Sequence, residues 1–164
     1  MTPTGFSSSI TNLMAGLIIL LSPLQSRAEA SATKRVITLA GAEAVIAAAK
    51  EFASHSGWSG VIAVTDPSGV LVSMERMDDA SVPAGVTIAP GKARTAALFR
   101  KPSGDLENAV NGQRPAAATA GDFVMMQGGL PIMQNGEIIG AIGVSADTPD
   151  HDLAIARAGA AAVH

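Results

Sequence analysis

The sequence contains no cysteine and no tyrosine, and its 164 residues include a single tryptophan, Trp58. A disulfide framework, a thiolate metal site and a cysteine nucleophile are therefore excluded. Aromatic residues make up only 3% of the chain, whereas hydrophobic residues make up 48% and charged residues 15%. This balance argues against disorder. It predicts a core of small and aliphatic side chains that pack through close approach of backbones.

The chain also lacks an excess of positive charge. Its formal net charge is −3 at pH 7, and its isoelectric point is about 5.5. Proteins that bind nucleic acid usually present a basic face to the phosphate backbone, so no nucleic-acid partner is expected. The length leaves room for one ordinary domain and a short appendage.

The appendage is predicted at the N-terminus. The apolar run at residues 13–24 is too short for a stable membrane helix, which needs about 20 residues. Ala28 and Ala30 then provide small residues at alternate positions, as signal peptidase requires, although no Lys or Arg precedes the apolar run. We predict a signal peptide at 1–30, a mature domain at 31–164 without a stable membrane span, and a periplasmic or secreted protein.

Turn residues and hydrophobic periodicity predict the elements of the domain. Asp66-Pro67-Ser68-Gly69 and Asn135-Gly136 are typical turn sequences and indicate two antiparallel hairpins. Hairpins joined through helices imply one antiparallel sheet with helices on its faces. The expected elements are a helix over 39–56, strands over 61–65 and 70–76, a helix from Pro90 to before Pro102, a helical turn over 105–110, strands over 123–126, 130–134 and 137–145, and a helix from Pro149 to about Val163.

Six segments, at 64–69, 75–78, 92–96, 128–131, 139–145 and 152–159, together resemble the GlcG/HbpS family of haem-binding proteins. The resemblance covers about 36–163. It implies an α+β fold: a profilin-like α-β-α sandwich around one five-stranded antiparallel sheet. It also implies homo-oligomers and the binding of haem or a related tetrapyrrole. Some members of that family are extracellular sensors for a receptor, and others are associated with glycolate utilisation or with cobalamin-modifying enzymes.

Two positions differ from the family pattern. Ala146 stands where a second glycine usually follows the strand, and Pro90-Gly91 interrupts a helix that is normally continuous. Both lie near the expected ligand pocket. The resemblance therefore defines the fold better than it defines the ligand.

Arg76 and Asp78 are candidate ligand-binding residues at a strand end. Their separation of two positions predicts side chains on the same side, where the arginine would bind a carboxylate. The alternative is a structural pair that closes the strand. Lys92 and Thr95 share a helix face, where the lysine would neutralise a propionate and the threonine would approach a metal or a ligand oxygen. The alternative is a lysine with a packed stem and a threonine in the core.

Gly128 and Gly129 are candidates for anion binding through backbone amides, although the start of a strand also needs small residues. Ser145 completes the candidate set; it lacks a nucleophile elbow, and no catalytic residue is assigned. Haem iron would need a His or Met donor in this chain. His55, His151 and His164 have no second histidine at metal-ligand spacing, and strand methionines are usually core residues, so the axial ligand stays unidentified.

The leading hypothesis is an exported haem- or tetrapyrrole-binding protein for capture, storage or sensing, with a receptor protein as a candidate partner. Two alternatives stay open. One is an enzyme acting on a small hydroxy or oxo acid, with Arg76 or Lys92 binding the carboxylate. The other is an oligomeric interaction module for a receptor.

Overall fold

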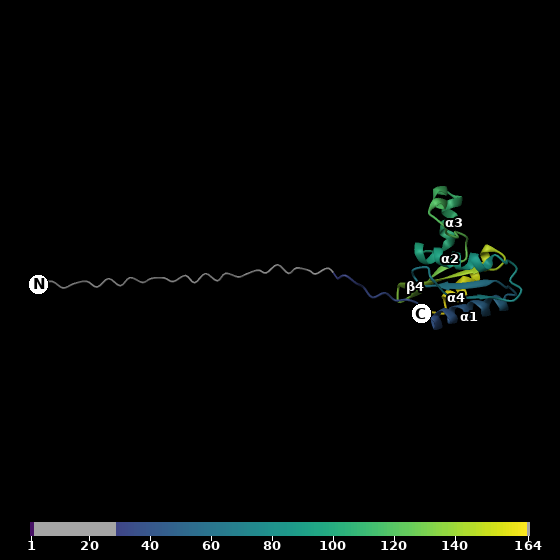
Figure 1. Ribbon diagram of the computed structural model, residues 1–164, viewed down its shortest axis with the longest axis horizontal. Coiled ribbons are helices and arrows are strands. Elements are labelled where there is room, and N and C mark those ends of the chain that lie inside the picture. The colour runs from purple at the N-terminus through teal and green to yellow at the C-terminus, as the bar shows by residue number, and fades with distance from the viewer. Residues whose placement is uncertain (2–28, 164) are drawn as a thin grey trace. The chain divides into compact units, whose positions relative to one another are not determined.

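The computed structural model describes Met1 and residues 29–163, so the predicted signal peptide at 1–30 lies almost wholly outside the described residues. In the described part of the chain, no helix combines the length and apolar character needed to cross a membrane. The elements shown in Figure 1 are α1 (Leu39–His55), β1 (Val61–Thr65), β2 (Leu71–Arg76), α2 (Gly85–Phe99), α3 (Ser103–Asn111), the 3₁₀ helix η1 (Pro115–Thr119), β3 (Gly129–Gln134), β4 (Glu137–Ser145) and α4 (Pro149–Ala160).

One antiparallel sheet organises the domain. Its strand order is β2-β1-β4-β3, so the two hairpins meet through the long-range pairing of β1 with β4. The predicted turns are confirmed. Asn135 and Gly136 have φ values of 51° and 78°, which is the geometry a two-residue hairpin requires. Asp66 Oδ1 accepts hydrogen bonds from the amides of Ser68 and Val70 at 2.7 and 3.0 Å.

The sheet lies between α2 on one face and α1 with α4 on the other (Figure 1). On the α1 and α4 face the core is aliphatic and includes Val45, Ile46, Ile62, Ile142, Val144 and Ile155. On the α2 face the side chains are smaller. A Cβ at Gly143 of β4 would collide with the backbone of Ala89 and Ala93 in α2. Helix and strand backbones are therefore in direct contact there, as the scarcity of large side chains predicted.

The sheet has four strands among the described residues, so the expectation of a fifth strand is wrong. Residues 123–126, predicted as a strand, form none. Instead the segment crosses α2: a Cβ at Gly91 would collide with Val124, and the ring of Phe123 meets that of Phe99 edge-on with centroids 4.8 Å apart. Its apolar side chains lie against a helix rather than in a sheet, with Phe123, Val124 and Met125 half-buried and Met126 exposed. A short apolar run does not reveal this difference.

The other correction concerns α2, which begins at Gly85 rather than at Pro90. Pro90 lies inside the helix, where it removes one backbone hydrogen bond. The helix persists because its first turns are held by the sheet: Ala89 is fully buried, and the Cα of Gly85 lies against Val61 and Ser145. The Pro90-Gly91 pair therefore does not interrupt the helix. The last helix is shorter than expected and ends at Ala160.

We predict that Gly143→Ala destabilises the domain by about 1–3 kcal/mol, because the new methyl group meets backbone on the facing helix and neither element can yield locally. Equilibrium urea denaturation measures the change. Gly104→Ala is the matched control: a Cβ there would touch only the flexible side chain of Gln127 at 3.5 Å. Alanine in α3 should be neutral or stabilising by up to about 1 kcal/mol. Equal losses in both variants would contradict the close-contact explanation.

Candidate functional site

A buried ion pair connects helices on opposite faces of the sheet. Lys92 of α2 is only 1% exposed, and its Nζ donates to Asp152 Oδ2 of α4 at 2.5 Å and to the carbonyl of Val144 at 3.0 Å. The other carboxylate oxygen, Oδ1, accepts from the amide of Ala146 at 2.5 Å. Both charges are thus hydrogen-bonded within the protein, which a buried ion pair needs in order to offset its desolvation.

Gly128 and Gly129 provide the space through which Lys92 reaches α4. A Cβ at Gly128 would lie 2.7 Å from the Cβ of Asp152 and 3.2 Å from Lys92 Nζ. A Cβ at Gly129 would collide with the carbonyl of Lys92, and the Gly129 amide already donates to Ser103 Oγ at 2.8 Å. These contacts explain why small residues are needed at the start of β3. Anion binding by these amides stays a prediction.

Thr95 and Ser145 lie in packed surroundings. Thr95 is fully buried, and its hydroxyl donates to the carbonyl of Gly91 at 2.9 Å. Ser145 is 6% exposed and pairs with Val61, the first residue of β1. In this arrangement the Thr95 hydroxyl and the Lys92 ammonium are both engaged inside the protein, so neither faces a cavity as a free ligand-binding group.

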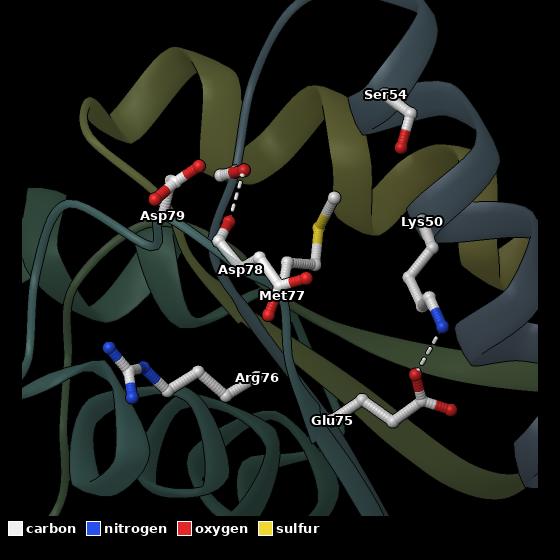
Figure 2. A pocket seen from close by; sticks show the side chains of 8 residues that line it. Lys50, Ser54, Glu75, Arg76, Met77, Asp78 and Asp79 are labelled. Carbon is white, nitrogen blue, oxygen red and sulfur yellow. Dashed lines mark hydrogen bonds and ion pairs between the residues drawn. The ribbon is translucent and has the colours of Figure 1, made fainter.

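Arg76 and Asp78 lie at the edge of the sheet, beside a hollow of about 460 Å³ (Figure 2). The two side chains point apart, because β2 ends at Arg76 and the alternation of a strand does not extend to Asp78. Among the described residues they form no ion pair. The hollow is bridged instead by the ion pair of Lys50 with Glu75, and the Asp78 carbonyl accepts from Ser59 Oγ at 2.8 Å. The candidate residues are therefore divided between two regions.

Asp152 is the residue that the sequence analysis missed as the partner of Lys92. Four residues of α4 are buried, Asp152, Ile155, Ala156 and Gly159. They have the spacing of one helix face. A carboxylate on the apolar face of a helix indicates a buried partner, and this signal was present in the sequence.

A second polar group lies at the N-terminus of α4. The imidazole of His151 stacks on Trp58 with centroids 3.8 Å apart, and its Nδ1 is 2.8 Å from Asp147 Oδ1. This hydrogen bond to His151 lowers the pKa of Asp147 below its usual value. Across the described residues, no three His, Asp or Glu side chains are grouped as a metal site would require.

A hollow with partly apolar surroundings was not predicted. It measures about 300 Å³ and lies between α3, η1 and the segment 123–126. We call it the methionine pocket; its lining residues are Glu107, Val110, Asn111, Ala118, Phe123, Met125 and Met126. The guanidinium of Arg94 lies 5.2 Å from the centre of the Phe123 ring. The pocket therefore combines apolar wall residues and two thioethers with the polar side chains of Glu107 and Asn111, and a cation lies beside it.

We predict that Lys92→Met costs about 3–5 kcal/mol of stability, because the Asp152 carboxylate stays buried without its counter-charge. The double variant Lys92→Met/Asp152→Leu should recover most of that loss in urea denaturation. Lys50→Met is the control. It breaks an ion pair whose side chains are 41% and 46% exposed, so it should cost less than about 1 kcal/mol. If the double variant is no more stable than Lys92→Met, the ion-pair explanation fails.

Comparison with known proteins matches the domain to one family. Residues 37–161 fit the family model described as haem degrading protein HbpS-like. The protein GlcG of Escherichia coli K12 is 43% identical over 113 residues, which is 69% of this chain and 84% of that protein. An uncharacterized 15.0 kDa protein from the dhaT-dhaS intergenic region of Citrobacter freundii is 35% identical over 128 residues, covering 74% and 87% of the two chains.

Solved structures agree with this assignment. A double mutant of HbpS from Streptomyces reticuli superposes with a TM-score of 0.77 at 30% identity, covering 87% of this chain and 97% of that one. A complex of PduOC with heme gives a TM-score of 0.71 at 25% identity, covering 79% and 96%. The chain belongs to the HbpS-like family, which confirms the resemblance found in its sequence segments.

Proposed function

We propose that this protein binds haem or a related tetrapyrrole in the methionine pocket, and that it does so outside the cytoplasm for capture, storage or sensing. The family assignment supports the ligand class, as does a structural neighbour solved in complex with heme. The observation in this chain that carries the proposal is an apolar hollow with two methionines on its wall.

The chemistry of the pocket fits a tetrapyrrole. Haem has an apolar macrocycle, an iron that takes His or Met as a protein donor in a chain without Cys and Tyr, and anionic propionates. Met125 and Met126 supply thioether donors, and Phe123 supplies an aromatic wall. Phe99 packs edge-on against Phe123 and fixes that wall. These residues would hold the group, which would supply its redox-active iron.

Arg94 is the cation placed to neutralise a propionate. Lys92 was predicted for that role, but its ammonium is paired with Asp152. Arg94 directly follows the buried Ala93 in α2. It is exposed, and its guanidinium lies over the ring of Phe123, which lines the methionine pocket. Its guanidinium also donates to the Asp122 carbonyl at 3.3 Å, which holds it beside the pocket.

No observation favours the small-acid enzyme. The Lys92 ammonium is already paired with the buried Asp152 carboxylate, and Arg76 lies on the edge strand β2, away from the other candidate residues. A homo-oligomer and a receptor partner remain part of our proposal. The exposed Leu71 and Met74 on β2 support an apolar contact with another chain.

We predict a saturable Soret shift when the protein is titrated with haemin. Met125→Ala or Met126→Ala should change the position of the Soret band, because one of these thioethers would ligate the iron of a bound haem. Arg94→Gln should weaken binding about ten-fold through the loss of one charge-assisted contact. Met133→Ala removes an exposed methionine of β3 outside the pocket and serves as the control. A flat titration, or equal effects of Met133→Ala and the pocket variants, would refute the proposal.

We further predict that the full-length protein, expressed in a Gram-negative host, is recovered from the periplasm with Ser31 as its first residue. The small residues before that position favour cleavage by signal peptidase. Cell fractionation followed by N-terminal sequencing measures both properties. Recovery of the intact chain from the cytoplasm would contradict export and leave the haem-binding test unaffected.

A further inference from the structure

A second hollow, of about 320 Å³, lies at the end of the sheet where four segments meet. These are residues 33–36, the β1–β2 turn, the C-terminal end of α2 and the start of β4. Their positions are fixed by contacts: the Ile37 amide donates to the Ile139 carbonyl at 2.8 Å, and Gly69 of the turn lies against Leu98 of α2. The hollow shares no lining residue with the methionine pocket.

The lining of this hollow is positively charged. It contains Lys34, Arg35 and Arg100 but only one carboxylate, Glu137. Arg35 and Glu137 pair at 3.6 Å with both side chains more than half exposed, so their interaction is weak. Lys34 and Arg100 form no ion pair within the described residues. In a chain whose net charge is −3, this is a local excess of uncompensated cations.

Arg100 has a backbone conformation that does not favour a side chain. It ends α2 with φ 56° and ψ 36°, the left-handed geometry that glycine usually supplies at this place. The turn is needed because Pro102 follows and restricts Lys101 to an extended conformation. Glycine would make the same turn without strain. An arginine in this conformation is uncommon, and residues in such conformations cluster at functional sites.

We propose that this hollow binds a small organic anion through a carboxylate or phosphate group. The planar guanidinium of Arg100 suits bidentate contact with either group, and Lys34 adds a point charge. The Ser68 hydroxyl is a further donor on the lining, while Val36 and Ile138 form apolar walls for the carbon part of the ligand. This site is independent of the proposed tetrapyrrole site.

The test is calorimetric titration of the full chain at low salt with two probes, inorganic phosphate and succinate. We expect saturable binding of at least one probe, and the tighter of the two identifies the anionic group. Arg100→Gly should weaken binding at least ten-fold and at the same time raise the midpoint of urea denaturation, because the left-handed strain is relieved. A folding defect therefore cannot explain the loss. Arg100→Lys should bind at an intermediate level.

Arg114→Gln is the matched control, since it removes an exposed cation that does not line the hollow. It should leave binding unchanged. The proposal is overturned if neither probe binds saturably, if Arg100→Gly binds as tightly as the unmodified chain, or if Arg114→Gln weakens binding as much as Arg100→Gly does. The haemin titration is independent of all these outcomes.

Discussion

The buried ion pair between Lys92 and Asp152 determines how the layers of this domain are joined. It extends from α2, past the end of the sheet, to α4, so the helices on the two faces have a direct polar connection. Gly128 and Gly129 must be small because the lysine passes them. The Ala146 amide is held by the same carboxylate. A buried ion pair contributes little net stability compared with apolar packing, but it requires one defined arrangement of its partners. The start of β3, the end of β4 and the first turn of α4 are therefore positioned together.

The methionine pocket exists because one segment leaves the sheet. If residues 123–126 paired with β3, their alternate side chains would be buried against the sheet. Instead Val124 packs on Gly91 of α2, and the neighbouring Phe123, Met125 and Met126 face α3 and η1. The loss of the expected fifth strand and the presence of an apolar hollow therefore have the same cause.

Local signals in the sequence predicted the local structure well. The two hairpins follow from their turn residues, and α1 follows from its apolar periodicity over 39–55, because both depend on neighbours in the chain. The start of α2 and the path of 123–126 depend on contacts with distant residues, which outweighed Pro90 and strand propensity. For the site, Lys92 and the two glycines were predicted to bind a ligand, and the contacts that the structure gives them could not be predicted without knowledge of Asp152. The alternation that related Arg76 to Asp78 stopped where β2 ended.

Trp58 stacks on His151 at the junction between α1 and α4. Because the chain has one tryptophan and no tyrosine, near-ultraviolet emission from the whole molecule arises almost entirely from this indole. His151 immediately precedes Asp152, whose carboxylate binds Lys92. The fluorescence of Trp58 therefore reports whether the first turn of α4 is packed in its native position. Intrinsic fluorescence therefore reports on the packing between the two helix layers at this point, and it needs no introduced label. A bound haem, which absorbs at the wavelengths of indole emission, would quench the same signal by energy transfer over the width of the domain.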